Sequence, residues 1–263
     1  MRLIKILLVL VAVIGGIWFF WPESEQEPVE VKVEEGYGSM EDLSRFSNFR
    51  GAYLEANGGE EQMENVQSVR TTGLMEIDGE TVPFFSLKRR PNQSLTTLKM
   101  PNYELTFVVN GEQIWQRIKA PGGETQYERK EGDQAKEIAK MGVFFDPLAR
   151  VLVFGEGAVE RLSPSTWMGN QTIKMEFQTE DAPSSAAYVD IATMHPLALV
   201  QELPDGRERK VIYGNYQSVD NMQIPFLLEN YLDDELQSRV ILEESHTNVG
   251  TVASIFEYPE SAE

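Results

Sequence analysis

Apolar and polar residues alternate along many short stretches of this 263-residue chain, and pairs of turn-forming residues separate these stretches. Residues 70–77 and 81–88 flank Asp78-Gly79, and a second pair of such runs flanks Asn110-Gly111. Alternation places successive side chains on opposite faces of a strand, and Asp-Gly and Asn-Gly tolerate the positive φ angles of a tight hairpin turn. The sequence therefore predicts antiparallel hairpins in which one face of the sheet is more apolar than the other.

The same pattern continues through the second half of the chain. Further strands are predicted at residues 159–162, 172–178, 187–192, 197–202, 210–213, 223–231 and 238–245. So many consecutive strands favour one long antiparallel sheet, and a sheet of this size tends to curl. Because no change of composition divides the chain after residue 38, we expect a single α+β domain over residues 39–260.

Helices are predicted at the start and in the middle of this domain. Ser39 is a candidate N-cap for a helix that ends at Asn57-Gly58-Gly59, and a short helical turn is expected at residues 60–66. A modest helix is expected at residues 131–141. Asp146-Pro147 then supplies an N-cap and a proline at the first helical position for an apolar helix. This last helix is too apolar to lie free in water, so it must cover another part of the fold.

The N-terminal 22 residues have the layout of a membrane-targeting segment. Arg2 and Lys5 precede an apolar run at residues 6–21, and tryptophan and phenylalanine at the end of this run suit a membrane interface. We expect residues 4–21 to span the membrane as an uncleaved anchor with a cytoplasmic N-terminus. Cleavage of a signal peptide near Gly15-Gly16 is the alternative, and in either case the rest of the chain is exported.

Residues 23–38 follow the predicted anchor at residues 1–22 and are rich in glutamate, with six glutamates and one lysine at residues 23–35. Such a segment repels itself and buries no core, so it is predicted to be a flexible acidic tether. The whole chain has a formal charge of −19, which would repel a phosphate backbone, and we expect no nucleic-acid partner. The absence of cysteine excludes disulfides, a thiol nucleophile and a lipid anchor on cysteine.

The sequence contains none of the common catalytic motifs. His195 and His246 are the only histidines, and each stands alone in a strand-like stretch. No nucleophile elbow, zinc-binding helix, phosphate-binding loop or dinucleotide fingerprint occurs. We therefore expect a protein that is not an enzyme and that has no catalytic residue, no metal site and no cofactor.

One ordered series of motifs indicates a family. Lys88-Arg89-Arg90-Pro91-Asn92 closes a predicted strand, and a hairpin with Asn110-Gly111 at its turn and Trp115 after it follows. This succession resembles the LolA/LolB-like family of periplasmic carriers that sort outer-membrane lipoproteins. Further segments resemble the first helix and opening strand, the lid helix, the late hairpin and the last strand of that family; they are residues 53–59 with 69–76, 144–154, 219–225 and 256–259. The resemblance covers residues 42–259.

The resemblance implies an incomplete, half-open β-barrel wrapped over the N-terminal helix and the inserted lid helices. Its concave apolar face would bind acyl chains, which need no polar motif for recognition. The candidate lining residues are Phe85, Leu87, Leu105, Phe107 and Val109 on the strands, facing Phe145, Leu148, Val151 and Leu152 on the lid. For each residue taken alone, an ordinary core position is the alternative, and the sequence favours it over lining. Arg90 matches an arginine that resembles a latch hydrogen-bonded to the lid region, and a charged strand end is the alternative reading.

The chain departs from the family in its N-terminal region. The soluble carrier of the family loses its signal peptide, whereas this chain retains a predicted anchor, and the membrane-bound receptor is acylated on a cysteine that is absent here. We therefore predict a monomeric periplasmic domain that binds lipid or lipoprotein acyl chains and is held at the inner membrane by residues 4–21. One alternative is a soluble periplasmic protein after signal cleavage. Another is a non-enzymatic exported interaction module whose filled core leaves only its surface to bind an envelope protein or polysaccharide.

Overall fold

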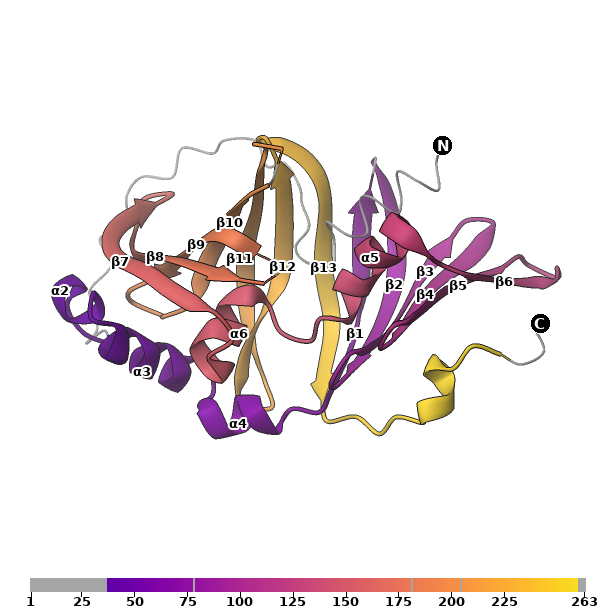
Figure 1. The fold of residues 1–263 in the computed structure, drawn as a ribbon, viewed down its shortest axis with the longest axis horizontal. Helices are drawn as coiled ribbons and strands as arrows, with labels where there is room; N and C mark the ends of the chain where they lie inside the picture. The colour runs from indigo at the N-terminus through magenta and orange to yellow at the C-terminus, as the bar shows by residue number, and fades with distance from the viewer. Residues whose placement is uncertain (1–36, 78, 181, 204, 260–263) are drawn as a thin grey trace.

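The computed structural model describes residues 37–77, 79–180, 182–203 and 205–259. These residues form one 13-stranded antiparallel sheet, which is curled and does not close into a barrel (Figure 1). In chain order the strands are β1 (Ser68–Ile77), β2 (Glu80–Arg89), β3 (Gln93–Met100), β4 (Tyr103–Asn110), β5 (Gln113–Lys119), β6 (Thr125–Arg129), β7 (Ala158–Trp167), β8 (Asn170–Thr179), β9 (Ala182–Asp190), β10 (Pro196–Glu202), β11 (Glu208–Val219), β12 (Met222–Leu232) and β13 (Glu235–Thr247). The predicted curled antiparallel sheet is confirmed.

The first and last strands meet in the middle of the sheet. The strand order is β6-β5-β4-β3-β2-β1-β13-β12-β11-β10-β9-β8-β7. Strands that are neighbours in sequence therefore pair with one another, except β6 and β7, which are the two edges. In addition, β1 pairs with β13. The central β1–β13 pair has an irregular register between Thr72 and Gly73. A Cβ atom at Gly73 would collide with the carbonyl oxygen of Ile241. The absence of a side chain there lets the two backbones approach closely, and the irregularity adds to the local bending of the strands.

Two groups of helices accompany the sheet. Before β1 lie α2 (Met40–Leu43), α3 (Phe46–Ala56) and α4 (Glu60–Asn65), and between β6 and β7 lie α5 (Gly132–Ala139), the 3₁₀ helix η1 (Lys140–Gly142) and α6 (Pro147–Phe154). The second group connects the two edges of the sheet and therefore runs across one of its faces (Figure 1). We call this face the inner face and the segment from α5 to α6 the lid.

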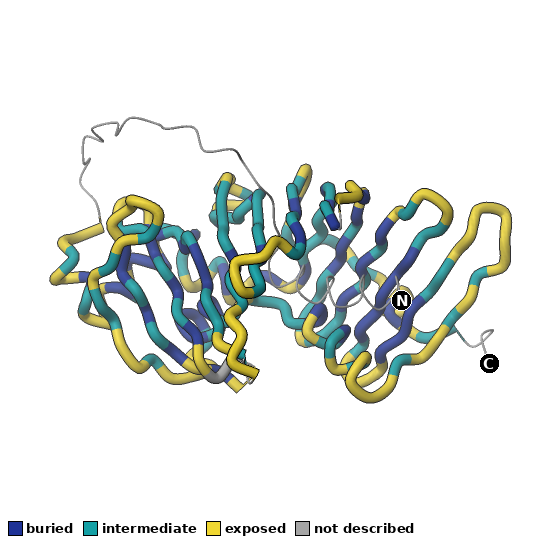
Figure 2. The backbone as a smooth tube through the Cα atoms, turned by 90° about the horizontal axis from the view of Figure 1, so that it is seen from above, coloured by how far each residue is buried: buried dark blue, intermediate teal, exposed yellow. Residues whose placement is uncertain are grey.

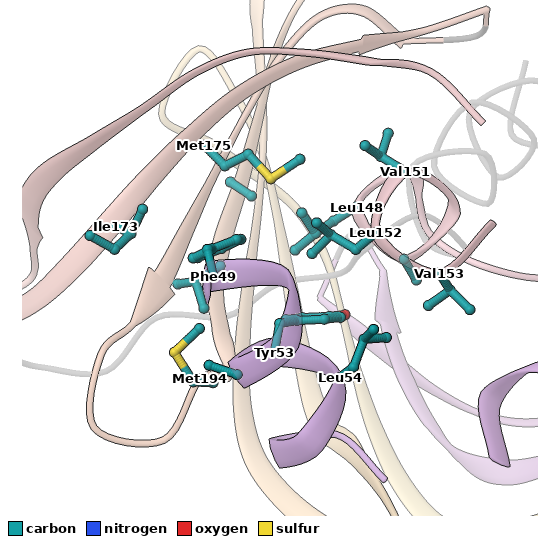
Figure 3. Close-up of a cluster of buried hydrophobic side chains, with 14 of the residues drawn as sticks. Phe49, Tyr53, Leu54, Leu148, Val151, Leu152, Val153, Ile173, Met175 and Met194 are labelled. Atoms are coloured by element: carbon teal, nitrogen blue, oxygen red, sulfur yellow. The ribbon is translucent and has the colours of Figure 1, made fainter. Parts of the chain in front are cut away.

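Three clusters of buried side chains make up the core, and Figure 2 shows their rows along the middle of the strands. The α6 cluster joins α3, α4 and α6 to the inner face of the half of the sheet that contains β8 to β11. In Figure 3, Phe49 and Tyr53 of α3 lie beside Leu148 and Leu152 of α6 and Met175 of β8. The α5 cluster joins α5 and η1 to the inner face of the other half, around β2 to β5. The residues of the three clusters all lie after position 42.

The third cluster, which we call the outer cluster, lies on the opposite face of β2 to β5. Leu87, Val108 and Trp115 are buried there against Phe256 of the 3₁₀ helix η2 (Ala253–Phe256). Trp115 Nε1 donates a hydrogen bond to Phe256 O at 3.2 Å. This half of the sheet is therefore covered on both faces, by the lid inside and by the C-terminal segment outside.

Most predicted elements are present, with four differences. Ser39 caps a helix as predicted, since its hydroxyl accepts from Asp42 N at 3.2 Å, but that helix ends at Leu43 and a separate helix, α3, follows. The prediction missed β3 and β6. The expected last strand at residues 256–259 is wrong, because Phe256 ends a 3₁₀ helix.

The predicted membrane segment cannot be compared with these elements. Within the described residues, no helix combines the length and the apolar composition needed to cross a bilayer. The predicted anchor at residues 1–22 and residues 23–36 of the predicted tether lie outside the described part of the chain.

Candidate functional site

The lid helix α6 begins and ends at residues suited to those positions. Asp146 Oδ1 accepts a hydrogen bond from Ala149 N at 2.9 Å, and Pro147 occupies the first turn, so the predicted N-cap is confirmed. Gly155 takes a left-handed conformation (φ 68°) at the other end, where few other residues fit without strain. The apolar residues of α6 pack into the α6 cluster, so the opposite side of the helix faces away from the core.

Lys88 of β2 holds the segment just before α6. Its Nζ donates to Val143 O at 2.7 Å. The surrounding protein lowers the pKa of Lys88 from 10.5 to about 8, because desolvation disfavours the ammonium ion, and the negative charge of Asp146 opposes this change in part. Desolvation by the surrounding protein also raises the pKa of Asp146, although this residue is exposed to water in part. Both groups are therefore surrounded by protein without being sealed from solvent.

Arg90 follows the end of β2, two residues after Lys88, and contacts the lid through aromatic rings. Its Cζ atom lies 4.8 Å, 4.9 Å and 5.6 Å from the ring centroids of Phe154, Phe145 and Phe144. The rings also contact one another, with centroids 4.9 Å apart for Phe144–Phe145 and for Phe145–Phe154. Rings attract a guanidinium through their negative faces, so these contacts favour the closed position of the lid.

The hydrogen bonds of the two cations differ from the expected latch. Arg90 Nη2 donates to Met63 O of α4 at 3.2 Å, and the hydrogen bond to the lid comes from Lys88 instead. A third cation, Arg50 of α3, donates from Nε to Leu152 O at 2.7 Å and also pairs with Glu60. Cations thus hold the lid in its middle, at residues 143–145, and at its end, at residues 152–154.

An open hollow of about 840 Å³ lies where Arg90 meets the lid. We call it the lid hollow. It is lined by Arg90, Pro91, Asn92, Lys136, Val143, Phe144, Phe145, Arg150, Phe154, Glu156 and Glu180. The volume falls in the range typical of ligand pockets, and the combination of aromatic walls with a few charged groups is also typical of them.

Two other cavities adjoin α6. One of about 50 Å³ lies beneath the helix and is lined by Tyr53, Asp146, Leu148 and Tyr213, among others. It has room for a few water molecules but not for an acyl chain. The other, of about 540 Å³, lies beside the edge strand β7 and includes Val151 in its lining. The lid hollow is the largest of these three cavities, and three phenylalanine rings line it.

The structure does not bring the nine predicted lining residues together. Phe145 lines the lid hollow with Arg90, Leu148 the small cavity and Val151 the cavity beside β7. Leu105, Phe107 and Val109 belong to the α5 cluster and Leu152 to the α6 cluster, and all four are at most 1% exposed.

Phe85 and Leu87 lie on the other face of the sheet. They belong to the outer cluster, so the expectation that they face the lid is wrong. The physical reason is alternation: Lys88 lies on the inner face of β2, which turns Phe85 and Leu87 outwards. The spacing of two residues could have identified Lys88 as a partner of Arg90. Phe144 and Phe154 bound the segment that resembles the lid helix, but they were not among the predicted lining residues.

The two histidines lie apart. The ring of His195 stacks on Tyr216 with centroids 4.3 Å apart, and burial lowers its pKa. His246 lies 3.8 Å from Glu244 at the surface. Among the described residues, no three histidine, aspartate or glutamate side chains converge on a point that could hold a metal ion.

Comparison with known proteins identifies the fold. No family model matches the chain, and no curated protein matches its sequence. The structure is similar to that of a DUF1329 family protein from Desulfovibrio piger, with a TM-score of 0.56 and 13% identity over 81% of this chain and 98% of the other. It is also similar to the LolA superfamily protein NE2245 from Nitrosomonas europaea, with a TM-score of 0.51 and 13% identity over 80% of this chain and 97% of the other. The chain therefore has a LolA-like fold, as its ordered motifs predicted.

Proposed function

We propose that this domain binds the acyl chains of lipids or lipoproteins on the periplasmic side of the inner membrane and catalyses no reaction. The observation that carries the proposal is the lid hollow, in which three phenylalanine rings surround an open space of about 840 Å³. Each methylene group transferred from water to such a surface contributes about 0.8 kcal/mol. A chain of ten or more carbons would therefore gain enough to bind without any polar contact.

The attachment of the lid supports the proposal. Lys88, Arg90 and Arg50 hold it through single hydrogen bonds and cation–ring contacts. Such contacts exchange readily with water, unlike the continuous packing within each half of the sheet. Movement of the link between α5 and α6, around Phe144 and Phe145, would enlarge the lid hollow without opening the cluster beneath either helix.

Residues 4–21 are proposed to anchor the domain in the inner membrane, with residues 23–38 as the tether. In this arrangement the domain binds its ligand beside one membrane and does not travel between two. Fractionation of cells followed by N-terminal sequencing of the membrane-bound protein tests the arrangement. Recovery of a protein that starts near residue 17 in the soluble periplasmic fraction would overturn it.

The binding proposal is tested with residues 37–263, which include all three core clusters. The fragment should carry co-purifying lipid, detected by extraction into organic solvent and mass spectrometry, and should take up a fluorescent fatty acid. Phe145→Ala should weaken this uptake, because Phe145 lines the lid hollow and contacts both neighbouring rings. A fragment without bound lipid and without uptake would refute the proposal.

A second function, an exported interaction module with a filled core, is favoured by the burial of Leu105, Phe107, Val109 and Leu152. These four predicted lining residues are packed side chains with at most 1% exposure. Binding of an envelope protein or polysaccharide that weakens with salt, by a fragment that takes up no lipid, would support this function over the first.

A further inference from the structure

Arg90 brings a positive charge into the apolar wall of the lid hollow. Its guanidinium contacts Phe144, Phe145 and Phe154 at 4.8–5.6 Å from their centroids. A charged group surrounded by rings on the wall of an open space matches the part of an amphiphile where the chain joins the head group. The chain would contact the rings while the head group meets the cation.

The hydrogen-bonding capacity of Arg90 is only partly used. Its guanidinium has five N–H donors, and among the described residues its side chain makes one hydrogen bond, to Met63 O. No carboxylate in the described ranges lies within ion-pair distance of it; Glu64 and Glu156 act on it only from further away. Since the rings are poor hydrogen-bond acceptors, the remaining donors suit an anionic group that enters the hollow.

The other charges at the lid hollow do not reverse this preference. Arg150 and Glu156, both in the lining, form a salt bridge of 2.9 Å and largely cancel. Lys136 adds a positive charge and Glu180 a negative one. The lining therefore has three cations and two carboxylates in a chain whose formal charge is −19, and Arg90 is the cation at the rings.

From this arrangement we propose that the ligand of the lid hollow is a long-chain fatty acid, whose carboxylate is bound by the free N–H donors of Arg90 and whose chain lies on the three phenylalanine rings. The proposal rests on the proposed function and specifies its ligand. A planar guanidinium can bind a carboxylate through two parallel hydrogen bonds. A volume of about 840 Å³ has room for a single long chain.

Binding of palmitate and of methyl palmitate to residues 37–263 tests the proposal, because the two ligands share a chain and differ in head-group charge. Hydrogen bonds to charged groups contribute about 1.5–3 kcal/mol, so palmitate should bind roughly 10- to 100-fold more tightly than the ester. Arg90→Gln should remove this difference between palmitate and the ester, and Arg90→Lys, which keeps the charge but not the fork, should leave an intermediate difference. Lys99→Gln is the matched control, since Lys99 is exposed on β3 and away from the hollow.

The outcomes separate the ligand assignment from the proposed function. Equal binding of palmitate and its ester by the wild type would overturn the role of Arg90 and leave acyl binding intact, and so would equal effects of Arg90→Gln and Lys99→Gln. Tighter binding to phosphatidylglycerol vesicles than to palmitate would overturn the fatty-acid assignment. Failure of both palmitate and the ester to bind would refute the proposed function itself. Circular dichroism and thermal unfolding of Arg90→Gln establish that the variant is folded, and ester binding by Arg90→Lys provides a second readout.

Discussion

Lys88 is a cation that holds the lid and is largely surrounded by protein. Its replacement by methionine tests whether its charge lowers the free energy of unfolding by an amount that depends on pH. The pKa of Lys88 is about 8 in the folded protein and 10.5 in the unfolded chain. Between these values the unfolded chain binds more protons than the folded one, so the free energy of unfolding rises with pH in this window. The cost of desolvating the ammonium ion is present in full below pH 8 and disappears above pH 10.5.

The size of the effect follows from the two pKa values. One pH unit between them corresponds to about 1.4 kcal/mol, which gives about 3 kcal/mol in total, and contact with water at this half-buried site reduces it to roughly 2 kcal/mol. Lys88→Met removes this cost and also removes the hydrogen bond to Val143 O, which contributes about 1 kcal/mol. The two changes oppose one another, so at pH 7 the free energies of unfolding of the variant and the wild type should differ by no more than roughly 1 kcal/mol.

Urea unfolding of both proteins at pH 7, 8, 9 and 10, followed by tryptophan fluorescence, measures the effect. The stability of the wild type relative to Lys88→Met should increase by roughly 2 kcal/mol over this range. Burial raises the pKa of Tyr53 and Tyr213, which lowers the stability of both proteins above pH 10 and cancels in the comparison. A difference that is constant from pH 7 to pH 10, or that changes in the same way in Lys99→Gln, would show that Lys88 is not the titrating group.

Three further substitutions test the sheet, the core and the lid. Gly73→Ala should destabilise the protein by about 1–3 kcal/mol in urea unfolding, because its Cβ would enter the neighbouring strand, whereas Gly214→Ala meets only ordinary contacts and should change little. Phe107→Ala should cost about 3–5 kcal/mol at a site with 1% exposure, while Phe145→Ala should cost less stability and more ligand affinity; equal stability losses would contradict this division. Asp146→Ala removes the N-cap of α6 and should lower the stability by about 1 kcal/mol, measured as a lower thermal midpoint. Asp146→Asn should retain most of the stabilisation, because asparagine also caps helices.

The sequence predicted those features that local chemistry determines. The hairpin turn lies one residue later than the predicted pair, at Gly111-Glu112, with a positive φ (61°) at Gly111, and the N-cap at Asp146 is where expected. Both depend on the conformational preferences of a few adjacent residues. Strand β3 was missed because its inward-facing residues are partly polar; Thr96, for example, is fully buried and shares a hydrogen bond of 3.1 Å with Ser86. Strand β6 was missed because it is a short and largely exposed edge.

The candidate site was harder to predict because both faces of β2 to β5 are apolar. Alternation shows that Phe84 and Phe85 lie on opposite faces, but it does not show which face is inside. That choice depends on what covers each face, and the cover of the outer face is a segment far along the chain, around Phe256. The position of Lys88 and Arg90, two cations spaced two residues apart, is the local signal that identifies the face of the lid.

The place of the lid hollow follows from how the chain connects the two edges of the open sheet. Edges β6 and β7 do not pair with one another, so the chain itself crosses between them through the lid. The start of the lid packs into the α5 cluster and its end into the α6 cluster, and the hollow lies at the link between them, around Phe144 and Phe145. Continuous packing is interrupted at this point, so a ligand displaces fewer core contacts here than anywhere beneath α5 or α6. An apolar chain that enters at Arg90 would therefore fill the gap between the α5 cluster and the α6 cluster and would not have to open either of them.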